Sequence, residues 1–172
     1  MRKVQLIRQQ SFLVIASLAL ILAFVLSACG ANSGGTGGGT SPTPTPTFTT
    51  VKGYGSSHGC PSDVVVTGTP AAPNVVARVT DNNSTIMAHT GNIVEVDLPF
   101  NQRWMGPTSS VSMLQLQMPA GYAWKVKNAC IWRFVAQGTG TTQLHFEGRA
   151  LCLQGQLCPQ YVLKLEFTVV VS

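Results

Sequence analysis

The stretch Gly91-Asn92-Ile93-Val94-Glu95-Val96-Asp97-Leu98-Pro99 decides how the folded part of this 172-residue chain is interpreted. Apolar Val94, Val96 and Leu98 alternate with acidic residues, which is the period of a β-strand that buries one face. A turn-forming Thr-Gly-Asn opens the strand. Pro99 ends it, because a proline ring has no N–H to donate to a neighbouring strand. The stretch therefore predicts a strand that belongs to a β-scaffold.

The segment that follows this strand is the first candidate binding loop. It runs from Asn101 to Gly106 and contains Gln102, Arg103, Trp104 and Met105, so a cation, an aromatic ring and a thioether lie together. Loops held by a rigid scaffold are common binding sites. Two interpretations stay open. Either Trp104 and Met105 contact a partner, or they fold back into the core.

The first 28 residues have the pattern of a bacterial lipoprotein signal peptide. A basic start is followed by an apolar run over 12–26, which is too short for a permanent membrane-spanning helix. Leu26-Ser27-Ala28-Cys29 resembles the lipobox, where signal peptidase II cuts before a cysteine that becomes lipidated. We expect a signal helix and a lipid on Cys29 that anchors the protein to the extracytoplasmic side of the cell envelope. The alternative is an ordinary secreted protein cut nearby.

Residues 29–59 read as the lipidated cysteine followed by a tether. Residues 34–40 are nearly all glycine and threonine, and residues 41–47 form a Ser-Pro-Thr-Pro-Thr-Pro-Thr repeat. Glycine-rich segments behave as flexible coils, while proline-rich segments are stiffer spacers. We therefore expect a disordered linker up to residue 59 and a folded domain over 60–172.

The net charge of +5 comes largely from the signal peptide. Three of the eleven Lys and Arg residues precede Cys29, so eight remain against six acidic residues. No run of basic residues is left to follow a nucleic-acid backbone. We expect no nucleic-acid partner and a monomeric exported domain.

The part from Cys60 onward reads as all-β. Short apolar stretches recur between turns rich in Gly, Pro, Asn and Asp, and this spacing predicts a β-sandwich of about seven or eight strands. The stretches are Val64–Thr67, Val75–Thr80, Ile93–Leu98, Met113–Gln117, Tyr122–Val126, Ile131–Ala136, Thr141–Glu147 and Tyr161–Val171. The expected core residues are Trp124, Trp132, Phe134, Leu144, Phe146 and Phe167.

Four cysteines lie in the expected domain, which indicates two disulfides in an exported protein. Cys152 and Cys158 flank a short segment and are expected to pair. This leaves Cys60 with Cys130, although other pairings stay open. A zinc site is the alternative, but the spacing lacks a paired C-x₂-C and the histidines lie far apart in sequence. We expect no metal and no cofactor.

Motifs of catalysis are missing from this sequence, which has no G-x-S-x-G, no H-E-x-x-H and no phosphate-binding glycine loop. His145 lies two residues from Glu147 on one strand face, and both are expected to be surface residues. Glu95 and Asp97 also share a strand face, as paired glycosidase carboxylates do, but solubility is the simpler explanation. We predict no catalytic residues and no enzymatic activity.

Three segments resemble chagasin-family inhibitors of papain-like cysteine proteases. Gly91–Asn101 is similar to the strand that leads into the first inhibitory loop of that family. Trp132–Glu147 is similar to the hairpin before the third loop, and Phe167–Val171 is similar to the closing strand. The resemblance implies an immunoglobulin-like antiparallel β-sandwich. It also implies non-covalent inhibition, by three neighbouring loops that plug the protease cleft.

The resemblance places the three loops on named residues of this chain. Asn101 and Gly106 match the ends of the first loop. The second loop falls at Lys127-Asn128-Ala129-Cys130, without the family's glycines. In the third, Arg149 matches an arginine, and Ala150-Leu151 stand where the family has Pro-Trp.

Two functions follow as expectations. The first is a surface-anchored inhibitor of papain-like cysteine proteases, with Trp104 as the main contact because aromatic residues dominate interface hot spots. It requires the three loops to meet at one end of the sandwich with Trp104 exposed. The alternative is a non-enzymatic immunoglobulin-like binding or structural module of the cell envelope, with an unknown protein or glycan partner.

Overall fold

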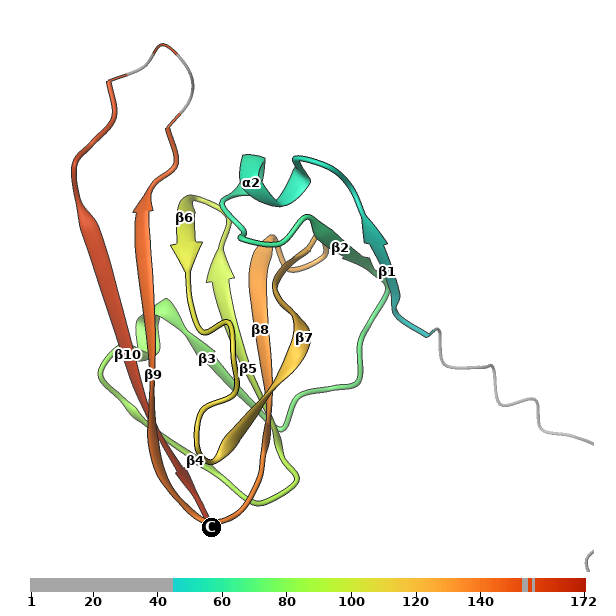
Figure 1. Cartoon of the computed structure of the whole chain (residues 1–172), viewed down its shortest axis with the longest axis vertical. Coiled ribbons are helices and arrows are strands. Elements are labelled where there is room, and N and C mark those ends of the chain that lie inside the picture. The colour runs from blue at the N-terminus through green and yellow to red at the C-terminus, as the bar shows by residue number, and fades with distance from the viewer. Residues whose placement is uncertain (1–44, 153–154, 156) are drawn as a thin grey trace, which may run out of the picture. The chain divides into compact units, whose positions relative to one another are not determined.

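The computed structural model describes residues 45–152, 155 and 157–172, and all of them belong to one compact unit (Figure 1). The expected signal peptide, the lipidation site Cys29 and the first part of the linker lie outside the described residues. Within the described part, no helix is long and apolar enough to cross a membrane.

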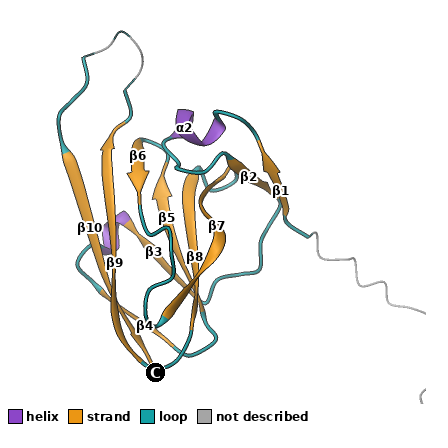
Figure 2. Cartoon of the chain, in the orientation of Figure 1, coloured by secondary structure: helices purple, strands orange, loops and turns teal. Residues whose placement is uncertain are grey.

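Two sheets form the domain, and strands account for most of the described residues (Figure 2). The six-stranded sheet has the order β1 (Thr47–Thr50), β2 (Val64–Thr67), β7 (Leu114–Trp124), β8 (Ala129–Ala136), β5 (Ile93–Pro99), β3 (Val75–Arg78). The four-stranded sheet has the order β4 (Thr85–Ala88), β10 (Val162–Val171), β9 (Gly140–Ala150), β6 (Gln102–Met105). The predicted all-β sandwich is confirmed, with ten strands in the described part instead of seven or eight. It is not antiparallel throughout, because the pairs β2–β7, β3–β5 and β4–β10 are parallel.

The core lies between the two sheets and follows the alternation of the sequence. Val94, Val96 and Leu98 of β5 are fully buried on one side of their strand. From the other sheet, Phe146 packs edge-on against Trp132, with ring centroids 5.1 Å apart. Of the six predicted core residues, only Trp124 lies elsewhere. It packs in a smaller cluster on the outer face of the six-stranded sheet.

The folded domain begins earlier than the sequence predicted. Strand β1 pairs with β2 from Thr47 to Thr50, and a short helix, α2 (Tyr54–His58), follows. The Asp63 carboxylate holds the start of this helix, since it accepts hydrogen bonds from the backbone N–H groups of Gly53 and Gly55 at 2.9 and 3.0 Å. Residues 47–59 were assigned to the linker because their composition is polar. Their order comes from partners that lie later in the chain.

Strand β7 joins two segments that the sequence separated by a turn. The predicted turn Pro119-Ala120-Gly121 is a shift in register within one strand, between Gln117 and Tyr122. Gly121 has φ +63° and lies against Pro61 and the Trp132 ring, so a Cβ at this position would collide with both. The strand continues past the irregularity because β8 offers it an unbroken partner on both sides.

Both predicted disulfides are present. Cys60–Cys130 is buried and links the segment after α2 to β8, over a sequence separation of 70 residues. Cys152–Cys158 closes the loop between β9 and β10.

The outer face of the six-stranded sheet contradicts one prediction. Glu95 was expected on an exposed face, yet its side chain is 0 % exposed, and that of Asp97 is 10 % exposed. Lys127 contacts Glu95 at 2.5 Å and Asp97 at 2.8 Å, and Arg133 Nε lies 3.0 Å from the second Glu95 oxygen. Burial raises the pKa of Glu95. Burial by itself would lower the pKa of Lys127, but the neighbouring carboxylates of Asp97 and Glu95 have the larger combined effect. The pKa of Lys127 is therefore raised.

The connection between β2 and β3 covers this face. Because β2 and β3 lie far apart in the sheet, residues 68–74 must cross the strands between them. The Gly68 carbonyl accepts a hydrogen bond from Trp124 Nε1 at 3.1 Å, and the Ala71 carbonyl accepts one from Arg133. The Asn74 side chain accepts one from the Ile93 N–H at 2.7 Å. This covering segment removes Glu95 from water.

Candidate functional site: the loop end

Three loops lie at the same end of the sandwich (Figure 1). Pro99, the last residue of β5, pairs with Ala129, the first residue of β8. Gln102, the first residue of β6, pairs with Ala150, the last residue of β9. The β5–β6 turn (100–101), the β7–β8 loop (125–128) and the β9–β10 loop (151–161) are therefore neighbours. We call this group, together with α2, the loop end.

The first predicted loop is mostly a strand. Only Phe100 and Asn101 form the turn, and Gln102 to Met105 make up β6. Trp104 is 1 % exposed and belongs to the main core, and its Nε1 donates a hydrogen bond to the Pro99 carbonyl at 2.6 Å. The interpretation that Trp104 folds back into the core is therefore the correct one, and the expectation of an exposed Trp104 is wrong.

A glycine across the sheet makes room for this ring. Trp104 pairs with Gly148 of β9, and a Cβ on Gly148 would lie 2.6 Å from the indole. Met105 stays partly exposed at the end of β6. Gly106 lies against the Phe146 ring in the core, and so it is not part of the loop end.

The β7–β8 loop is tied to the β5–β6 turn. Asn128 has φ +52°, a left-handed conformation that asparagine tolerates better than most residues. Its carbonyl accepts a hydrogen bond from the Phe100 N–H at 3.2 Å, which joins the first two loops. Lys127 points back to the buried Glu95, while Val126 at the tip is 74 % exposed.

The β9–β10 loop carries the third set of predicted residues. Arg149 and Ala150 are the last residues of β9, and Leu151 begins the loop that Cys152–Cys158 closes. Arg149 is exposed and lies 3.6 Å from Glu147. Leu157, inside the disulfide ring, is fully exposed. The structure therefore brings Asn101, Gln102, Asn128, Arg149, Ala150 and Leu151 to one end.

Helix α2 belongs to the loop end, which sequence reasoning missed. His58 packs edge-on against Phe100 with ring centroids 4.9 Å apart, and Lys125 lies 4.8 Å from the Tyr54 ring centroid. At five residues α2 is too short to show a helical period. Glycines on either side of Tyr54–His58, both with positive φ in the structure, are the feature of the local sequence that marks the ends of this helix.

Two hollows open beside β6 at this end. One of about 600 Å³ is lined by α2, Cys60–Pro61, residues 103–105 and Ala150–Cys152. The second, of about 260 Å³, is lined by Arg149, Gln160 and Tyr161, among others. Arg103 lines both of them. A third hollow of about 440 Å³ lies next to the β7–β8 loop and includes Arg78 and Asn128.

The polar groups here suit recognition through contacts. In the part of the chain that the structure describes, no three His, Cys, Asp or Glu residues are grouped as metal ligands would be. His145 is exposed as predicted, and its Nδ1 lies 3.9 Å from a carboxylate oxygen of Glu166. The loop end offers cations, exposed apolar tips and backbone groups, which are the components of a protein-binding surface.

Comparisons with known proteins give a likeness to two solved structures. The cysteine protease inhibitor EhICP2 from Entamoeba histolytica matches with 15 % identity and a TM-score of 0.37, and amebosin matches with 14 % identity and a TM-score of 0.34. Each match covers 59 % of this chain and 100 % of the other chain. No protein-family model and no curated protein matches the sequence.

Proposed function

We propose that this domain is a non-enzymatic inhibitor that binds the cleft of a papain-like cysteine protease with its loop end. The supporting observation is the convergence of the β5–β6, β7–β8 and β9–β10 loops at one end of the sandwich. Three neighbouring loops can present one combined surface to the cleft of a protease.

Covalent and hydrogen-bonded links within the loop end favour binding. The buried Cys60–Cys130 bridge joins the segment after α2 to β8, directly below the β7–β8 loop. The second bridge closes the β9–β10 loop, and the bond between Phe100 and Asn128 joins the other two. A surface that is ordered before binding loses less conformational entropy on association.

One requirement set by the sequence analysis, an exposed Trp104, is not met, because this ring is buried in the core. The proposal therefore rests on the exposed apolar residues at the tips of the other two loops instead of on Trp104. Val126 at the tip of the β7–β8 loop is 74 % exposed, and Leu157 in the β9–β10 loop is 101 % exposed. When a partner covers exposed apolar side chains, the loss of their contact with water makes the binding free energy more favourable. We therefore assign the main contacts to these two loops.

Lipidation of Cys29 would hold this inhibitor at the envelope, where it would meet secreted proteases. The lipobox-like sequence before Cys29 supports this part of the proposal. Cys29→Ser should move the protein from the membrane fraction to the soluble fraction. Membrane association of the variant at the wild-type level would argue against a lipid anchor.

A binding module for another envelope protein or glycan is the second candidate. The family resemblance implies that the first loop makes a main contact with the protease. In this structure the first loop is only a two-residue turn, which favours the second candidate. A sandwich that presents two loops and a short helix need not fit a protease cleft. The fold alone does not separate the two candidates.

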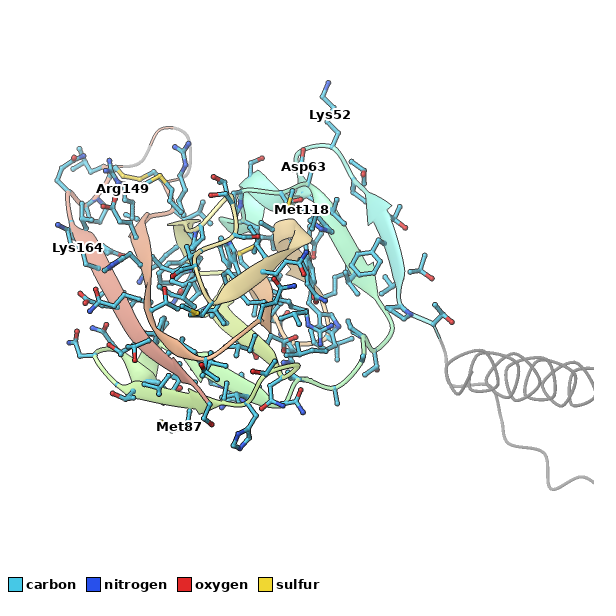
Figure 3. All side chains as sticks on the ribbon, turned by 60° about the horizontal axis from the view of Figure 1, so that its bottom comes forward. Lys52, Asp63, Met87, Met118, Arg149 and Lys164 are labelled. Atoms are coloured by element: carbon cyan, nitrogen blue, oxygen red, sulfur yellow. A yellow bond between two sulfur atoms is a disulfide. The ribbon has the colours of Figure 1, made fainter. Side chains whose placement is uncertain are left out.

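An inhibition titration separates them. The exported chain, residues 29–172 with Cys29→Ser, is added to papain and to a cathepsin L-type protease. We expect inhibition that Leu157→Asp and Val126→Asp each weaken at least about tenfold, because a charge would be buried at the interface. Met87→Asp is the control, since Met87 is also exposed but lies at the other end of the molecule (Figure 3). Absence of inhibition at micromolar concentration would reject the protease proposal and favour the second candidate.

A further inference from the structure

Two arginines face each other on the outer side of the four-stranded sheet. Arg103 of β6 and Arg149 of β9 are direct partners in the antiparallel register, and both side chains are exposed. Residues in such pairs have Cβ atoms only about 5 Å apart, so two like charges at these positions destabilise the sheet. An anion that binds between the two side chains would remove this repulsion.

The chain itself supplies little negative charge here. Glu147 lies 3.6 Å from Arg149, and Arg103 has no ion pair within the described residues. All six acidic residues of the sequence lie in the described part, so each can be traced. The other five lie elsewhere: Asp63 binds the backbone at α2, Asp81 binds the Arg78 N–H, Glu95 and Asp97 bind Lys127, and Glu166 lies near His145.

The shape around the pair also points to a ligand. Arg103 lines both the hollow of about 600 Å³ and that of about 260 Å³, so its side chain lies where the two meet. Arg149, Gln160 and Tyr161 line the smaller one. Tyr161 and Val162 are each about half exposed, which places apolar surface next to the two guanidinium groups. Figure 3 shows Arg149 beside the disulfide of the β9–β10 loop.

We propose that Arg103 and Arg149 bind a carboxylate on an acidic segment of the protein that docks on the loop end. This inference rests on the proposed function, in that it assumes a protein partner at this end. Guanidinium groups bind carboxylates through pairs of parallel hydrogen bonds, and arginine is enriched in protein interfaces. A nucleic-acid backbone would need a longer row of cations, whereas this site has one pair flanked by apolar side chains.

A peptide titration tests the site without a protease. The exported chain with Cys29→Ser is titrated with a capped hexaglutamate peptide, with the matching hexaglutamine peptide and with inorganic phosphate. The NMR signals of the arginine Nε–Hε groups are followed. We expect hexaglutamate to bind and to shift both arginine signals, hexaglutamine to leave them unchanged, and phosphate to bind more weakly. Arg103→Gln and Arg149→Gln should each weaken hexaglutamate binding by about tenfold.

Lys164→Gln is the matched control, because Lys164 is an exposed cation on the same sheet face, and the smaller hollow does not include it. Arg103→Lys keeps the charge but loses the planar fork, and it should fall between the wild type and Arg103→Gln. Equal losses for Lys164→Gln and the arginine variants would mean unspecific attraction and would overturn the proposal. So would phosphate binding as strong as that of hexaglutamate, which would mark a phosphate site.

The same variants separate this inference from the proposed function. Inhibition that Arg103→Gln and Arg149→Gln leave at the wild-type level would reject the carboxylate site while the inhibitor proposal stands. Arginine-dependent peptide binding by a protein that inhibits neither protease would keep the carboxylate site and reject the inhibitor proposal. Weaker inhibition by both arginine variants, with Lys164→Gln unchanged, supports the two together.

Discussion

The outer faces of the two sheets share a sequence pattern but have opposite environments. On β5, Glu95 and Asp97 alternate with valine and leucine, and on β9, His145, Glu147 and Arg149 alternate with leucine, phenylalanine and glycine. Glu95 is 0 % exposed and bound to two cations, whereas the Glu147 side chain is 41 % exposed and lies 3.6 Å from one arginine. We call these the covered face and the open face.

The difference comes from a segment remote from both strands. Residues 68–74 cross the covered face and bond to Trp124, Arg133 and Ile93, while the open face has no such cover in the described part of the chain. Buried charges remain only where opposite charges and hydrogen bonds compensate for lost hydration. The covered face is therefore a compensated ion network, whereas the charged side chains of the open face stay exposed to solvent.

The largest expected effect is the loss of the buried cation. Arg133→Met keeps most of the side-chain volume but leaves Glu95 with Lys127 alone and the Ala71 carbonyl without its donor. We expect the free energy of unfolding to fall by about 3 kcal/mol, measured by urea denaturation. On the open face, Arg149→Met should change it by less than about 1 kcal/mol and can raise it, because a like-charge pair is removed.

A double variant sharpens this prediction. If the cost of Arg133→Met is mainly the unpaired charge of Glu95, then Glu95→Leu in the same chain should restore part of the lost stability. Equal losses for Arg133→Met and Arg149→Met would show that the covering segment does not exclude water, and the contrast between the faces would then fail.

The next effect concerns the covering segment itself. Trp124→Phe removes the hydrogen bond to the Gly68 carbonyl and part of the packing in the small outer cluster. We expect a loss of about 1–2 kcal/mol in thermal or urea unfolding. Tyr161→Phe is the open-face control, because this exposed ring loses only a hydroxyl group in contact with solvent, and its stability should match the wild type. An unchanged Trp124→Phe protein would mean that the covering segment is not held by this bond.

The smallest effect is a dependence on pH. Burial raises the pKa of Glu95, so the folded protein takes up a proton at Glu95 more readily than the unfolded chain does. The contribution of protonated Glu95 to the stability of the fold is therefore complete below its unfolded-state pKa of about 4.3. It is lost as the pH rises through the pKa of Glu95 in the folded state. The stability of Glu95→Gln relative to the wild type should rise over this window. A difference that is constant with pH, or that falls, would contradict this assignment.

Several features were predicted correctly from local pattern alone. Alternation placed Val94, Val96 and Leu98 on the buried side, because a strand's period of two needs no knowledge of its partners. Cysteine spacing in an exported domain led to both disulfides. The position of the loop segments at one end was implied by the family resemblance and not by local pattern. Trp104 and Met105 lie in β6 instead of a loop, and Gly106 packs against the core.

The burial of Trp104 and Glu95, and the order of residues 47–59, could be seen only in the tertiary structure. Trp104 enters the core because Gly148, 44 positions later, leaves space for its ring. Glu95 loses water because residues 68–74 cross its sheet face, and β1 is ordered because β2 pairs with it. Local sequence thus determined which side of the predicted strands is apolar. Which polar faces are covered depended on segments far away in sequence, whose positions follow only from the packing of the whole domain.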